Sequence, residues 1–98
     1  MITEMAQIEI REGEAEAFEA AVARAVPIFL AADGCHDIRL VRSEELPTRY
    51  RLLVEWETVE HHTETFRGSE GFARWRELAG GFFVQAPQVE HVRDVLPG

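Results

Sequence analysis

The 98-residue sequence contains no lysine and no asparagine, and its only cysteine is Cys35. Without lysine, no Schiff base can form on a side-chain amine, and without asparagine no mechanism can use that amide. A lone cysteine cannot close an intrachain disulfide, and it lacks the companion ligands of a structural zinc site. Nothing near Cys35 in the sequence indicates a lowered thiol pKa, so we do not expect it to act as a nucleophile.

Positive charge is also scarce, because ten arginines face 18 acidic residues and the formal net charge is −8. Such a chain repels nucleic-acid phosphates and anionic lipid surfaces, so we expect neither as a partner. No apolar run approaches the length of a membrane span, and the first residues lack a basic region followed by an apolar stretch. We therefore expect a cytoplasmic protein whose partners are small molecules or other protein chains.

Hydrophobic residues make up 46% of the sequence and charged residues 29%, which is typical of an ordinary globular domain. Alternation of apolar and polar residues, which is weak over residues 35–43, predicts strands over residues 2–11, 35–43, 49–57 and 88–95. Apolar residues recurring every three or four positions predict a helix from about residue 14 to 29, with a kink or loosened turn at Pro27. A second helical region begins after Thr58, a plausible N-cap, and ends at Gly80. It breaks at Gly68 and Ser69, where Ser69 can cap the second part.

The order β-α-β-β-α-β predicts an α+β, ferredoxin-like fold, in which both helices cover one face of a four-stranded antiparallel sheet. The opposite sheet face would then present Met5 and Leu53, with Val41 or Val92 nearby, among charged side chains. A second copy packing sheet to sheet is the natural cover for these apolar residues, so we expect a homodimer.

Several stretches resemble the antibiotic biosynthesis monooxygenase family. They are Asp33-Gly34-Cys35-His36, residues 53–57, residues 62–75 with a central Phe-Arg-Gly-Ser, and residues 87–91. The resemblance spans roughly residues 2–95 and implies a single ferredoxin-like domain there. It also implies a dimeric α/β barrel and an apolar pocket in each subunit between the sheet and the helices.

Members of that family include cofactor-free oxygenases of phenols and quinols, an autoinducer-degrading enzyme and haem-degrading oxygenases. The haem-degrading group depends on an asparagine, a tryptophan and a histidine, whose places here fall near Ala6, near Thr65 or Phe66, and near Arg76. None of the three is retained, so we expect no haem chemistry. Four histidines without closely spaced carboxylates do not predict a metal site either, and we expect no cofactor.

His62 is the first candidate for a catalytic base, because it lies one helical turn before Phe66 and should point toward the sheet face that holds Trp56. His36, at the start of a predicted strand, is the second candidate. His61 should point elsewhere, and His91 could serve a dimer contact. For each histidine the alternative is a structural residue that makes an ordinary hydrogen bond.

Aromatic residues would form the walls of a substrate pocket if the core leaves one open. The candidates for substrate binding are Trp56, Phe66, Phe72, Trp75 and Phe83. The alternative is that each is ordinary core. The arginines could hold a phenolate or carboxylate, or could simply pair with the many glutamates.

These residues predict a cofactor-independent monooxygenase that uses molecular oxygen on a small aromatic, phenolic or quinol compound. A base, a cation for the resulting anion and dry apolar walls are what that reaction requires. Two alternatives stay open. One is an isomerase, cyclase or decarboxylase that uses the same pocket, and the other is a non-catalytic dimer that binds a small hydrophobic ligand.

Overall fold

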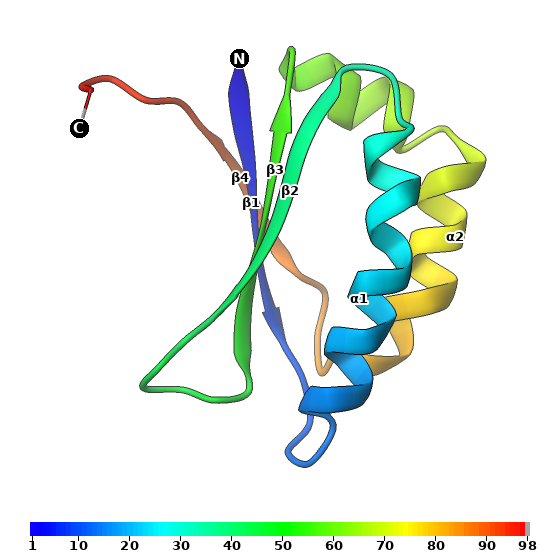
Figure 1. The fold of residues 1–98 in the computed structure, drawn as a ribbon, viewed down its shortest axis with the longest axis vertical. Coiled ribbons are helices and arrows are strands. Elements are labelled where there is room, and N and C mark those ends of the chain that lie inside the picture. Colours follow the sequence, from blue (N-terminus) through cyan, green and yellow to red (C-terminus); the bar gives the residue numbers. More distant parts are fainter. Residues whose placement is uncertain (98) are drawn as a thin grey trace.

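The computed structural model describes residues 1–97 and shows a four-stranded antiparallel sheet with two main helices on one face (Figure 1). The predicted ferredoxin-like α+β fold and its element order are confirmed. The strands lie side by side in the order β2-β3-β1-β4. The elements are β1 (Ile2–Glu9), α1 (Ala15–Leu30), β2 (Cys35–Arg42), β3 (Arg49–Trp56), α2 (Glu70–Ala79) and β4 (Gln88–Val92).

The inner face of the sheet packs against the helices and forms the core. Alternation along β1 and β3 places every second residue inward, as the sequence predicts. These inward residues meet the apolar stripe of α1, so burial of both faces stabilises the contact. The central buried residues are Ala6, Ile8, Tyr50, Leu52, Val54, Phe18, Val22 and Phe29.

Pro27 does not end α1, which continues to Leu30 before the chain turns into β2. Gly34 directly precedes β2 and has φ of 82°. The side chain of His61 packs against Gly34, where a Cβ atom would lie 2.4 Å from the imidazole ring. This close approach fixes the start of the second helical region over the entrance to β2.

The second helical region is broken in two, as predicted, but its first part is wider than an α-helix. Residues His61–Phe66 form a π-helical segment, in which the N–H of Arg67 donates to the carbonyl of His62. The predicted caps are confirmed as well. Thr58 Oγ1 accepts from the N–H of His61 at 3.2 Å, and Ser69 Oγ accepts from the N–H of Phe72 at 3.3 Å.

The opposite face of the sheet has no covering layer within residues 1–97 (Figure 1). On this face Val41 is 37% exposed, and Met5, Leu53 and Val92 are partly exposed. Within the described residues, no helix is long and apolar enough to cross a membrane.

Two glycines with similar positive φ angles provide a test of the contact between Gly34 and His61. Gly13 has φ of 84° and open space around the position that a methyl group would take, whereas the same methyl group at Gly34 would overlap His61. We expect Gly13→Ala to cost about 1 kcal/mol of unfolding free energy through backbone strain alone. Gly34→Ala should cost about 1–3 kcal/mol more, through overpacking. Urea unfolding of both variants measures this, and equal losses would contradict the packing role.

Candidate functional site

A cavity of about 820 Å³ opens between the inner face of the sheet and α2. Strand residues form one side, and α2 together with the segment leading into β4 forms the other. Its volume lies in the range of small-molecule sites. Its lining includes Glu4, His62, Arg67, Phe72, Trp75, Arg76 and Phe83.

Glu4 is a buried acid in the lining of this cavity. It lies on the inward face of β1, in alternation with Ala6 and Ile8, and is 5% exposed. Trp56 on the adjacent strand donates its indole N–H to Glu4 Oε1 at 2.9 Å. Burial raises the pKa of Glu4 to about 7, although the Trp56 hydrogen bond and the positive charge of Arg67 both act to lower it.

His62 lies against the same carboxylate. Its ring is 3% exposed, stacks on Trp56 with centroids 5.6 Å apart, and places Nε2 3.3 Å from Glu4 Oε1. Burial lowers its pKa to about 4, with smaller contributions in the same direction from Arg67 and His91. The imidazole is therefore neutral near pH 7. The predicted orientation of His62, toward the sheet face that holds Trp56, is confirmed.

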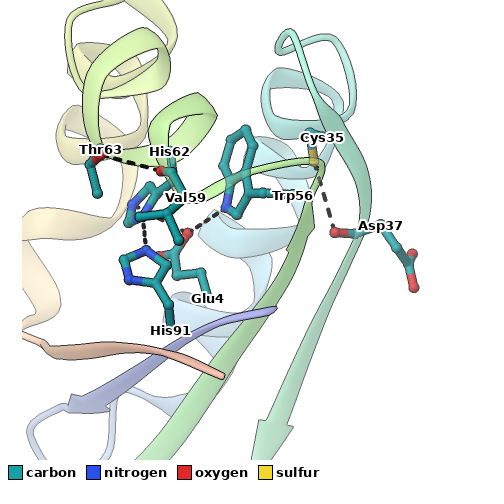
Figure 2. Close-up of polar contacts among 8 residues, drawn as sticks. All are labelled: Glu4, Cys35, Asp37, Trp56, Val59, His62, Thr63 and His91. Atoms are coloured by element: carbon teal, nitrogen blue, oxygen red, sulfur yellow. Dashed lines mark hydrogen bonds and ion pairs between the residues drawn. The ribbon is translucent and has the colours of Figure 1, made fainter. Parts of the chain in front are cut away.

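His91 completes a row of three groups (Figure 2). It lies on β4 directly across from Glu4 in the sheet register, and its Nε2 is 2.8 Å from His62 Nδ1. One of these two nitrogens donates and the other accepts, so the tautomers of the two rings depend on each other. Glu4, His62 and His91 therefore form one contiguous row of polar contacts, which we call the acid–imidazole row.

The acid–imidazole row can accept a proton from a bound molecule near neutral pH. Between about pH 4 and pH 7 Glu4 is protonated and His62 is neutral, because the pKa of Glu4 is the higher of the two. Above pH 7 the carboxylate is ionised beside a neutral imidazole. A carboxylate with this pKa in a partly dehydrated cavity is suited to general acid–base chemistry.

The sequence-predicted aromatic residues fall into two groups. Phe72, Trp75 and Phe83 line the cavity. Trp56 and Phe66 lie outside the lining, in the core, where they are fully or almost fully buried and their rings are 5.3 Å apart. Trp56 still reaches the site through its hydrogen bond to Glu4.

The predicted histidines are separated too. His36 is half-exposed, with Nε2 4.0 Å from a Glu57 carboxylate oxygen, and it is not a cavity residue. His61 points away from His62 and contacts Thr58 through Nδ1 at 2.8 Å. Within residues 1–97, no group of three or more His, Cys, Asp or Glu side chains is arranged to hold a metal ion.

Sequence reasoning missed Glu4, although a signal was present. Its position two residues before Ala6 puts it on the inward face of the first strand, where a charged residue is unusual. The pairing of His62 with His91 joins residues 29 apart in the sequence and depends on the sheet register.

Comparison with known proteins places this geometry in context. The model of the antibiotic biosynthesis monooxygenase family matches residues 1–78. The uncharacterized protein YczJ of Bacillus subtilis (strain 168) is 42% identical over 95 residues, which cover 97% of this chain and 100% of that protein.

Solved structures agree with this match. A crystal structure of a candidate antibiotic biosynthesis monooxygenase from Bordetella bronchiseptica is 48% identical, covers 97% of each chain and has a TM-score of 0.95. A counterpart from Nitrosomonas europaea is only 14% identical, with a TM-score of 0.80 over 98% of this chain and 100% of its own, and shows the fold alone.

Glu4 and His62 should affect stability in opposite directions as pH changes. The folded state keeps a proton on Glu4 up to about pH 7, whereas the unfolded carboxyl loses it near 4.5, so rising pH destabilises the fold in that interval. Unfolded His62 binds a proton below 6.5, but the folded ring resists protonation down to about 4, so rising pH stabilises the fold there. Between pH 4.5 and 6.5, the changes in unfolding free energy with pH that come from Glu4 and from His62 are opposite and largely cancel.

In Glu4→Gln the pH dependence of stability should show the contribution of His62 without the opposing one of Glu4. We expect the unfolding free energy of the variant to gain about 3 kcal/mol relative to the unsubstituted protein between pH 4.5 and 7, because the destabilising slope is removed. Urea unfolding at a series of pH values measures the difference between the two curves. Glu45→Gln, at an exposed turn residue, is the control and should give a parallel curve. If the difference in unfolding free energy between Glu4→Gln and the unsubstituted protein does not change with pH, the raised pKa of Glu4 is contradicted.

Proposed function

Because the chain belongs to the antibiotic biosynthesis monooxygenase family, we propose that it is a cofactor-independent monooxygenase of a small aromatic phenol or quinol. The observation that supports this most is the buried Glu4 carboxyl, whose pKa is about 7 and which lies in the lining of the cavity. A base of that strength is ionised often enough at neutral pH to remove a phenolic proton.

The reaction follows from the chemistry of electron-rich phenols. Once deprotonated, the phenolate passes one electron to dioxygen, and the resulting radical pair combines into a ring peroxide. Protonation of the peroxide and loss of water then leave a quinone, so one oxygen atom stays in the product and the other leaves in water. The substrate supplies all the electrons, and no external reductant is required.

Glu4 is a better base for this reaction than His62, the residue that the sequence analysis favoured. The pKa of His62 is lowered to about 4, which makes its neutral ring a weak proton acceptor at neutral pH. The ring instead lies with Nε2 3.3 Å from Glu4 Oε1 and keeps the carboxylate in place. His36 is remote from this cavity, and we assign it no part in the reaction.

The other cavity residues suit an aromatic anion. Phe72, Trp75 and Phe83 offer apolar surface for a ring, and the guanidinium groups of Arg67 and Arg76 offer positive charge for a phenolate oxygen. The same features also suit proton transfer beside a carbonyl, as in an isomerase, cyclase or decarboxylase. The raised pKa of Glu4 favours that second candidate function equally, and the requirement for oxygen separates the two.

We also propose that two copies pair through the uncovered sheet face. Met5 and Leu53 are neighbours across β1 and β3, and Val41 on β2 and Val92 on β4 extend the apolar area to the outer strands. An apolar sheet face of this kind is stabilised when a second sheet packs on it.

Turnover with isotopically labelled oxygen tests the proposed reaction. With 1-naphthol, 1,8-dihydroxynaphthalene and menadiol as probes, we expect product to incorporate one atom from ¹⁸O₂ and turnover to stop without oxygen. Glu4→Gln should lower kcat by about 100-fold or more, because general base catalysis is lost. Glu45→Gln, at a residue outside the cavity lining, should leave kcat unchanged.

Turnover that continues without oxygen would replace the proposal with the second candidate function. Ligand-induced thermal stabilisation without product would indicate a binding protein.

Sedimentation of variants on the sheet face tests the pairing. The protein should sediment at twice the chain mass of 11.1 kDa, and Leu53→Glu should sediment as a single chain because it places a charge in the apolar contact. Leu46→Glu, at a residue 47% exposed in the β2–β3 turn, is the matched control and should remain paired. A single-chain mass for the unsubstituted protein at tens of micromolar would contradict the proposal.

A further inference from the structure

The acid–imidazole row links the cavity to the edge of the sheet. Glu4 lines the cavity, His62 touches both Glu4 and His91, and His91 is partly exposed on β4. The contacts are 3.3 Å from Glu4 Oε1 to His62 Nε2 and 2.8 Å from His62 Nδ1 to His91 Nε2. In Figure 2 the three side chains follow one another without an intervening group.

The protonation state of Glu4 determines where each ring holds its proton. When Glu4 is protonated, its O–H donates to Nε2 of His62, and Nδ1–H of His62 donates to Nε2 of His91. When Glu4 is ionised, Nε2–H of His62 donates to the carboxylate, and Nδ1 of His62 accepts from Nε2–H of His91. Both arrangements satisfy every contact, and neither places a positive charge on the buried ring.

We propose that Glu4, His62 and His91 form a proton relay between the cavity and solvent. Glu4 gives its proton to Nε2 of His62 while Nδ1 of His62 gives its proton to Nε2 of His91. His91 then releases the proton on its own Nδ1 to water, so one proton leaves and each ring has changed tautomer. Within residues 1–97 no hydrogen-bond partner occupies Nδ1 of His91.

A relay at this point would serve the proposed oxygenase, on which this inference rests. A proton that stays on Glu4 can return to the phenolate before dioxygen reacts with it. Moving the proton to solvent prevents that return, and Arg67 and Arg76 in the cavity lining offset the negative charge that remains. The same path, used in reverse, supplies the proton that the ring peroxide later requires.

A neighbouring side chain holds the acid–imidazole row in place, and few other titratable or charged groups face Glu4. Trp56 donates to the same Glu4 oxygen that faces His62 and stacks on the His62 ring, which fixes both partners. Besides the two histidines, the titratable or charged groups that face Glu4 are Arg67, which favours its ionised form, and Cys35 on β2, whose own pKa is raised by burial and by Glu4. Neither interrupts the row.

Nitrogen NMR of the protein labelled with ¹⁵N-histidine tests the relay without any substrate. Between pH 5 and 9 we expect the proton of neutral His62 to move from Nδ1 to Nε2, with a midpoint near the Glu4 pKa of about 7. In Glu4→Gln the ring should keep one tautomer throughout. A single tautomer across this range in the unsubstituted protein, or formation of a His62 imidazolium, would overturn the relay.

Kinetics of His91→Gln separate proton transfer from a structural role. A glutamine amide can still donate to His62 Nδ1, but it cannot accept a proton at one atom and release it from another. We expect at least a tenfold lower kcat, an unchanged KM and partial recovery in concentrated imidazole buffer. Activity equal to the unsubstituted protein would overturn the relay, as would a loss that added imidazole does not recover.

The two experiments keep the relay and the proposed function apart. If turnover proves independent of oxygen while His62 changes tautomer with Glu4, the proposed function fails and the relay stands. If ¹⁸O enters the product but His62 keeps a single tautomer, the relay fails and the oxygenase stands.

Discussion

The burial of one carboxyl group, that of Glu4, determines the chemistry of this fold. A buried acid is tolerated when hydrogen bonds satisfy it, and here Trp56 and His62 approach the same oxygen from a strand and from the π-helical segment. These contacts replace only part of the lost hydration, so the pKa of Glu4 rises to about 7. A residue whose burial costs stability at neutral pH thus has a proton affinity suited to chemistry at that pH.

The position of His62 depends on local features outside the cavity. The wide π-helical turn begins where Thr58 caps the chain, and His61 packs on Gly34, so consecutive histidines point in opposite directions. Segments of this kind are rare and are often found at functional sites. Here the turn brings a neutral ring between an acid on a central strand and His91 on an edge strand.

The sequence predicted the order of the elements because period-two and period-three-to-four patterns report which face each residue buries. It also predicted the caps at Thr58 and Ser69 and the orientation of His62. The site itself was less accessible. Glu4 was overlooked because a single polar residue near a chain end appears solvated, and the contact between His62 and His91 depends on the pairing of β1 with β4, which no local pattern encodes. The burial that raises the pKa of Glu4 and lowers the pKa of His62 could not be inferred from the spacing of residues in the sequence either.

The number of charged groups explains why an acid and a neutral imidazole suit this cavity better than an imidazole alone. Transfer of a phenolic proton to ionised Glu4 moves one negative charge from the protein to the ligand, so the number of charged groups in the cavity does not change. Transfer to His62 would create a positive ring in a place where burial and Arg67 already oppose protonation. In a partly dehydrated cavity, creating a charge costs more than moving one. The geometry therefore favours the carboxylate as proton acceptor and leaves the imidazole to pass the proton onward.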